Sequence, residues 1–257
     1  MSLLISLQAI ILGGFIMVKS HAIEIFDGYA TEYDQWFLAN KQVFLSELKL
    51  LKSALDLSST KHVLSIGCGS GLFEDTLHRQ YGLPLFDGVE PSTDMAQIAK
   101  KRGLNVRIGK AESINLPARQ YDTIYFNGSS SYIKDLLAAY QNCIKALKSG
   151  GHFILIDVPK ESAYGLMYML AKIQGNYQSE ELANVLPKWP YPIELVDSAY
   201  WHTTLEKKHL LENELQLRHL RFKQTLVANP LYTNDSAEEP EDGFSKGGYV
   251  AIIAEKP

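Results

Sequence analysis

Three glycines, Gly67, Gly69 and Gly71, stand close together in the segment KHVLSIGCGSGLFEDTL, where a short apolar run changes into an amphipathic helical pattern. Glycine costs backbone entropy at such a junction, so the absence of side chains at these three positions needs a structural or functional reason. The pattern predicts a strand-to-helix loop on which a ligand lies directly against the backbone, in space that side chains would otherwise fill. A tight turn without a ligand is the alternative. A dinucleotide site usually has the spacing G-x-G-x-x-G, whereas this chain has G-x-G-x-G, with Leu72 at the third glycine position.

A carboxylate follows at a matching place in the next predicted strand. Glu90 ends that strand in the segment FDGVEPS. The ends of the first two strands of a doubly wound sheet lie side by side, and a carboxylate there can accept hydrogen bonds from both hydroxyls of a ribose. A lone glutamate at a strand end could also be a solvated charge. Together with the glycine loop, Glu90 predicts a site for an adenosine-bearing ligand.

The surrounding elements alternate between strands and helices, which places these residues in an α/β fold. Short apolar runs predict strands at 62–66, 85–90, 105–109, 121–127 and 152–157, and helical patterns lie at 40–55, 72–80, 92–101 and 132–147. A capping box at Thr203 and Glu206 opens another helix. Two later strands, within 215–227 and 247–255, are predicted to pair antiparallel at the sheet edge. We therefore expect a doubly wound, mostly parallel seven-stranded sheet with an antiparallel final strand.

Two segments of the chain do not follow this alternation of strands and helices. Residues 1–16 are apolar but lack the basic residues that precede the hydrophobic run of a secretory signal. We interpret them as a non-native or disordered extension upstream of a start at Met17, with a membrane anchor as the alternative. Residues 17–257 are then one domain. Within it, the aromatic and methionine-rich segment 158–202 is predicted to be a helical insertion that covers the substrate, although it could also be a small core of its own.

Composition limits the partners that this chain is expected to have. The net charge is −4 and the sequence pI is about 6.0, which argues against nucleic acid as a partner. The two cysteines, Cys68 and Cys143, form no disulfide framework, which favours a reducing compartment such as the cytoplasm. The histidines are scattered and the two cysteines lie far apart, so no metal site is expected. No membrane association is expected either, and the oligomeric state stays open.

Together these segments resemble the class I S-adenosylmethionine-dependent methyltransferases, in particular the small-molecule group typified by ubiquinone-biosynthesis enzymes. VLSIGCGSG is similar to the first motif of that family and GVEPSTDMAQIAKKR to the second. GKAESINLP, YDTIYFNGSSSYIKD and ALKSGGHFILID resemble later strands and loops, and FDGYATEYDQWF resembles an N-terminal lid. The resemblance covers roughly residues 26–157. It implies a Rossmann-like methyltransferase fold, with S-adenosylmethionine as the cofactor and methyl donor.

The resemblance also implies which residues bind the cofactor. Glu90 would hold the ribose, Met95 would pack on the adenine, and the acidic segment at 111–113 would read the adenine amino group. The full set of implied cofactor-binding residues is Tyr29, Tyr33, Ser65, Gly67, Cys68, Gly69, Gly71, Glu90, Pro91, Ser92, Met95, Ala111, Glu112, Ser113, Asn127, Gly128 and Ser129.

One position departs from the family pattern. Ser65 stands where the family usually has Asp or Glu, an acid that helps to hold the cationic amino group of the cofactor. Serine can still donate a hydrogen bond but brings no charge, which would weaken binding by about 1 kcal/mol. Ser65 therefore keeps a second hypothesis open, that of a non-catalytic S-adenosylmethionine-binding protein or partner subunit. An NAD(P)-dependent oxidoreductase is a third, disfavoured by the glycine spacing.

The expected reaction is methyl transfer to a small molecule by in-line displacement. Enzymes that methylate exocyclic amines of nucleobases typically carry an Asn/Asp-Pro-Pro-aromatic run after the fourth strand, and this chain has NGSSSY at 127–132 without a proline. The sequence identifies neither the methyl acceptor nor a catalytic residue. His202, beside the insertion, could deprotonate a substrate, although a surface role is equally compatible with its place in the chain.

Overall fold

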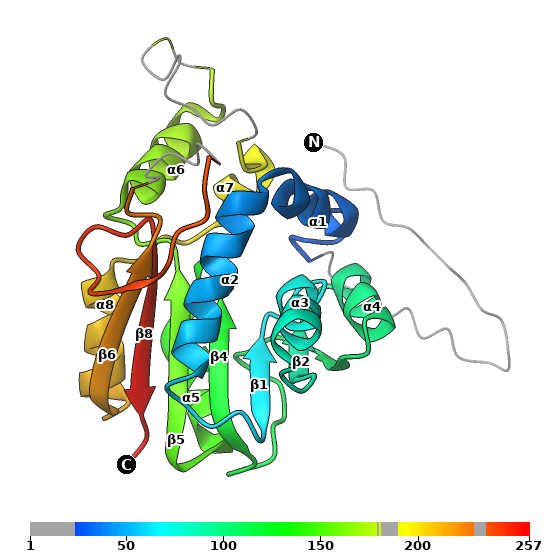
Figure 1. The fold of residues 1–257 in the computed structure, drawn as a ribbon, viewed down its shortest axis with the longest axis vertical. Coiled ribbons are helices and arrows are strands. Elements are labelled where there is room, and N and C mark those ends of the chain that lie inside the picture. The colour runs from blue at the N-terminus through cyan, green and yellow to red at the C-terminus, as the bar shows by residue number, and fades with distance from the viewer. Residues whose placement is uncertain (1–23, 179, 181–189, 229–234) are drawn as a thin grey trace, which may run out of the picture.

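The computed structural model describes residues 24–178, 180, 190–228 and 235–257 (Figure 1). The predicted extension at 1–16 therefore lies outside the described residues, as does part of the predicted cover at 158–202. The described elements, in chain order, are α1 (Ala30–Ala39), α2 (Lys41–Leu55), β1 (Val63–Ile66), α3 (Leu72–Tyr81), β2 (Asp87–Glu90), α4 (Thr93–Lys101), β3 (Asn105–Ile108), β4 (Tyr121–Asn127), the 3-10 helix η1 (Ser130–Tyr132), α5 (Leu136–Ala146), β5 (Leu147–Asp157), α6 (Ala163–Gln174), α7 (Ile193–Ser198), α8 (Thr204–His209), the π-helical turn η3 (Leu210–Glu214), β6 (Arg218–Thr225), β7 (Glu241–Asp242) and β8 (Tyr249–Glu255).

The strands form one sheet in the order β3-β2-β1-β4-β5-β8-β6-β7. The pairs from β3 to β5 are parallel, and β8 runs antiparallel to both β5 and β6. This arrangement confirms the predicted α/β class, the mostly parallel sheet and the antiparallel final strand. The described sheet has eight strands where the sequence predicts seven, because the two residues of β7 pair with β6 inside the acidic connection that leads to β8.

The region around α5 differs from the sequence prediction. The predicted helix at 132–147 begins four residues later, at Leu136, because Asp135 caps its N-terminus by accepting a hydrogen bond from the Ala138 N–H. The two glycines expected only to stop that helix, Gly150 and Gly151, lie within β5, which starts at Leu147 instead of His152.

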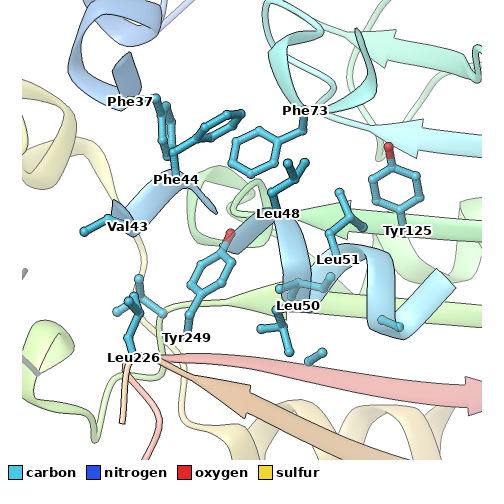
Figure 2. Packing of buried hydrophobic residues seen from close by; sticks show 14 of the residues in the cluster. Phe37, Val43, Phe44, Leu48, Leu50, Leu51, Phe73, Tyr125, Leu226 and Tyr249 are labelled. Atoms are coloured by element: carbon cyan, nitrogen blue, oxygen red, sulfur yellow. The ribbon is translucent and has the colours of Figure 1, made fainter. Parts of the chain in front are cut away.

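Alternation along the strands creates a separate core on each face of the sheet. Along β5, Ile154 and Ile156 face the cluster formed with α2 and α3, whereas Phe153 and Leu155 face the cluster formed with α5. Figure 2 shows how one side of α2 and its neighbours fill the first of these cores, with these labelled residues: Phe37, Val43, Phe44, Leu48, Leu50, Leu51, Phe73, Tyr125, Leu226 and Tyr249. Burial of these side chains fixes α2 against the sheet.

The helices α1, α6 and α7 gather at the end of the sheet where the parallel strands finish (Figure 1). This is the edge at which open α/β sheets bind their ligands. The described part of the 158–202 segment is helical, as predicted, since it contains α6 and α7.

Candidate active site

The glycine loop connects β1 to α3 in a left-handed backbone conformation. The φ angles of Gly67, Gly69 and Gly71 are +67°, +56° and +73°, values that other residues rarely adopt. A Cβ on Gly67 would collide with Cβ of Ser129, and one on Gly71 would lie 3.1 Å from a methyl carbon of Leu104. The prediction that ligand space requires all three glycines is therefore wrong for Gly67 and Gly71, where the protein's own side chains fill that space. It fits Gly69, because a Cβ there would meet no atom closer than 3.9 Å.

Glu90 lies at the end of β2 and is tied to this loop. Its Oε2 accepts a hydrogen bond of 2.8 Å from the Gly69 N–H, and its Oε1 accepts one of 2.9 Å from the Ser92 N–H. The side chain is 4% exposed. Burial raises the pKa of Glu90 to about 7, although the two N–H donors act in the opposite direction. Glu90 thus lies beside the glycine loop, as the sequence predicts.

A cavity of about 370 Å³ opens along the loop and Glu90. Volumes of this order are typical of small-molecule sites. The sequence-predicted residues that line it are Tyr33, Gly67, Gly69, Glu90, Pro91, Met95, Ala111, Glu112, Asn127, Gly128 and Ser129. The structure therefore brings together residues from α1, α4, the ends of β2 and β4, and the loops that follow β1, β2, β3 and β4.

Six predicted residues do not line the cavity, and Ser65 is the most informative of them. It is buried in β1, where its hydroxyl donates a 2.7 Å hydrogen bond to Oε1 of Glu74. The Tyr125 hydroxyl donates to the same oxygen over 2.6 Å. A carboxylate therefore lies one hydrogen bond from the position where the family's acid is replaced by serine. Glu74 comes from α3, and burial raises its pKa.

Of the other five, two belong to the glycine loop, one lies directly before α4, and two lie elsewhere. Cys68 is buried beneath Gly88, and burial raises the pKa of its thiol. Ser92 caps α4 by accepting a hydrogen bond from the Met95 N–H. Gly71 is the N-cap of α3. The remaining two are Tyr29, half-buried before α1, and Ser113, exposed after β3.

The segment before and within α1 is fixed to the glycine loop and to α4. The Ser92 hydroxyl donates to Asp27 over 2.7 Å, and the Gly28 N–H donates to Asp94 over 3.0 Å. Asp34 forms an ion pair of 2.6 Å with Arg102. The segment for which the resemblance implies a lid thus lies beside the cavity, where Phe26 and Tyr33 contribute to the lining.

The cavity also has lining residues that the sequence prediction does not include. Many are aromatic, and two of the others are the carboxylates Glu47 and Asp157. Glu47 could have been found from the sequence, because it follows Phe44 by three residues and precedes Leu51 by four, on the apolar side of α2. The other aromatic residues that line the cavity are Phe26, Trp36, Phe37, Phe73, Tyr168, Tyr191, Tyr200, Trp201, Tyr249 and Tyr132, the last of which the sequence already suggests because it flanks the loop after the fourth predicted strand.

His202 is not among the residues that line the cavity. Burial and the nearby Lys207 lower the pKa of its imidazole. Its Nε2 atom is buried and has no hydrogen-bond partner within the part of the chain that the structure describes. The structure thus gives no support to His202 as the base. Nor do the described residues contain a group of three or more His, Cys, Asp or Glu placed to hold a metal ion.

Comparison with known proteins identifies the class of this site. The family model described as a methyltransferase domain matches residues 38–225, so the chain belongs to that family. A crystal structure from Thermotoga maritima, described as a SAM-dependent methyltransferase and possible histamine N-methyltransferase, superposes with a TM-score of 0.75 at 27% identity, over 91% of this chain and 98% of that one. The protein is thus an S-adenosylmethionine-dependent methyltransferase, and S-adenosylmethionine is its cofactor.

Two sequence relatives extend this comparison. An uncharacterised protein of Methanocaldococcus jannaschii is 28% identical over 91% of this chain and all of its own length. A ubiquinone biosynthesis O-methyltransferase of Coxiella burnetii is 26% identical over 55% of this chain and 58% of its own. The resemblance stated from the motifs is therefore confirmed. Across the described ranges, no helix combines the length and the apolar character that a membrane span requires.

Proposed function

We propose that this methyltransferase acts on a small-molecule acceptor, which it holds in the covered cavity at the carboxyl ends of β4 and β5. The observation that carries the proposal is the set of residues that line the cavity. Aromatic side chains from α1, α6, β8 and the segment 190–202 line the cavity together with Glu90 and the glycine loop. The mostly apolar cavity of about 370 Å³ must hold the cofactor as well, and the room that is left suits a compact molecule better than a polymer.

The residues near the glycine loop fit an adenosine-bearing cofactor. A carboxylate has about four acceptor positions, and two positions on Glu90 already accept the N–H groups of Gly69 and Ser92. The two that are left can accept the ribose hydroxyls. The buried side chain of Met95 would pack against the adenine, and the carboxylate of Glu112 would accept from its amino group. When bound, S-adenosylmethionine supplies an activated methyl group on a sulfonium sulfur.

The protein's own contribution to the reaction is alignment and exclusion of water. A bound methyl group needs a nucleophile in line with it, and a covered cavity holds the acceptor close while removing competing solvent. The lid contacts of Asp27 and Asp34 keep α1 over the site. In this proposal, α1 moves away when these contacts break, which lets the cofactor enter, and the contacts form again once the cofactor is bound.

Radiolabel transfer tests this proposal directly. The purified protein is incubated with S-adenosyl-[methyl-³H]methionine and a cell extract divided by ultrafiltration into small molecules and macromolecules. We expect label in a product of the small-molecule fraction, and none with Glu90→Ala. Label found only in protein or nucleic acid would contradict the proposal. Cofactor binding without transfer to the small-molecule fraction would contradict it as well.

A further inference from the structure

Glu47 is a carboxylate in an apolar environment. It lies on the side of α2 that packs against the sheet, between Phe44 and Leu48, and is only 4% exposed. Among the described residues it has neither a hydrogen-bond partner nor an ion pair. An isolated buried carboxylate is costly unless a partner compensates it. Because Glu47 lines the cavity, a ligand can supply that partner.

The other buried carboxylates of the cavity wall already have hydrogen-bond or ion-pair partners within the protein. Glu90 accepts two backbone N–H groups. Asp157 forms an ion pair of 2.8 Å with Lys207 and also accepts the Ser131 hydroxyl and the Val158 N–H. Within the part of the cavity wall that the structure describes, Glu47 is therefore the buried acid available to a substrate.

Aromatic rings surround the same space. Trp36 and Tyr191 meet edge to face with centroids 5.3 Å apart, and Tyr168 stacks on Trp201 with centroids 5.2 Å apart. All four line the cavity together with Glu47. The faces of aromatic rings attract cations, and a carboxylate among them supplies the opposite charge. This combination suits an ammonium group much better than a neutral hydroxyl or an anion.

Glu47 lines the same cavity as Asn127 and Asp157, the last residues of β4 and β5. Burial first, and then nearby charges that include Glu47, raise the pKa values of Tyr33 and of Tyr249, whose hydroxyl donates to Asn127 at the end of β4. Glu47 therefore shares one cavity with Tyr33 and Tyr249.

Building on the proposed methyltransferase function, we propose that the acceptor is an amine and that Glu47 binds its ammonium group and removes a proton from it. The proton passes from nitrogen to an Oε atom of Glu47, which frees the nitrogen lone pair. The N–C bond then forms as the C–S bond of the sulfonium breaks, and the electron pair of that bond stays on sulfur. The products are the N-methylated ammonium ion and S-adenosylhomocysteine, and Glu47 releases its proton to solvent when the product leaves.

The acidity of Glu47 is consistent with this role. Burial, and to a smaller extent the charge of Asp157, raise its pKa to about 8. An ammonium group bound beside it would favour the ionised form. The titratable groups that face it are Tyr33 on α1, Asp157 on β5, Tyr191 before α7 and Tyr249 on β8.

Calorimetric titration with three probes of the same shape tests the inference. The full-length protein, saturated with S-adenosylhomocysteine at pH 8, is titrated with 2-phenylethylamine, 2-phenylethanol and phenylacetate. We expect the amine to bind at least tenfold more tightly than the alcohol, and the anion to bind most weakly. The affinity for the amine should also rise about tenfold from pH 7 to pH 9 as Glu47 ionises, because an alkylamine stays protonated over that range.

Two variants isolate the carboxylate. Glu47→Gln should bind the amine at least tenfold more weakly, lose its pH dependence and leave the alcohol unchanged. Lys49→Gln is the matched control, since Lys49 lies on the same helix with an exposed partner, Glu239, and should change neither affinity. Thermal melting checks the fold: without its buried charge, Glu47→Gln should melt at a higher temperature than wild type at pH 9 and at a similar one at pH 5.

The outcomes that overturn the inference are distinct from failure of the proposed function. Equal binding of amine and alcohol, an unchanged amine affinity in Glu47→Gln, or no binding of the amine by protein that does bind S-adenosylhomocysteine would each refute an amine site at Glu47. The same protein could still methylate another small molecule. Absence of S-adenosylhomocysteine binding would instead refute the cofactor site on which the proposed function depends.

Discussion

Replacing Glu90 with alanine is the perturbation that follows most directly from the geometry of the cofactor site. The carboxylate has two acceptor positions free after it accepts the Gly69 and Ser92 N–H groups. Each hydrogen bond to a charged group contributes about 1.5–3 kcal/mol. Two such bonds to a ribose would contribute about 3–6 kcal/mol, and about 1.4 kcal/mol corresponds to a factor of ten in Kd.

We therefore expect Glu90→Ala to weaken S-adenosylhomocysteine binding at least a hundredfold, as measured by isothermal titration calorimetry. Asp87→Ala is the matched control. Asp87 begins the same strand, where its carboxylate accepts hydrogen bonds from Asn105 and Tyr121, and it does not line the cavity. That variant should bind the ligand as wild type does.

The two variants are compared below their melting temperatures, because Glu90→Ala also leaves two buried N–H groups without their acceptor. A folded Glu90→Ala protein whose Kd stays within threefold of wild type would refute the assignment of Glu90 to the ribose. A loss of affinity as large in Asp87→Ala would show that the effect comes from the sheet and not from the ligand contact.

Three further predictions concern pH, charge burial and the loop. With a pKa of about 7, Glu90 is mostly ionised at pH 8 and mostly protonated at pH 6, so cofactor affinity should fall about tenfold over that interval; a flat titration profile would contradict this. Lys207→Met leaves the Asp157 carboxylate buried without its ion pair and should lower the free energy of unfolding, measured by urea titration, by about 3–5 kcal/mol. A loss below about 1 kcal/mol would contradict this prediction. Gly67→Ala combines a φ of +67° with a collision at Ser129, so it should cost about 1–3 kcal/mol of stability and weaken cofactor binding, whereas unchanged stability would show that the loop adapts.

Local patterns predict the sheet well, and most of the residues predicted to bind the cofactor line one cavity. Short apolar runs, the Ser92 N-cap and the Thr203 capping box depend on neighbouring residues, so they can be seen in the sequence, and the structure has all of them. Strand β5 begins earlier than expected because glycines that usually end a helix also tolerate the irregular pairing between β4 and β5. Pairing partners of this kind are distant in sequence and leave no local pattern.

The acceptor side of the cavity depends on contacts between distant segments. Trp36 and Tyr191 are 155 positions apart, and nothing local to either residue indicates that their rings meet. The link between Ser65 and Glu74 is closer in sequence, yet it requires the glycine loop to turn α3 back over β1. Glu47 is the exception, since an acid on the apolar side of an amphipathic helix can be recognised from spacing alone.

A crystal structure of the protein with S-adenosylhomocysteine tests the central claim most directly. The ribose hydroxyls are predicted within hydrogen-bonding distance of the Glu90 carboxylate, with the adenine against Met95 and the sulfur facing the aromatic side of the cavity that contains Glu47. Density for the ligand outside this cavity, or a ribose turned away from Glu90, would contradict the account of the cofactor site.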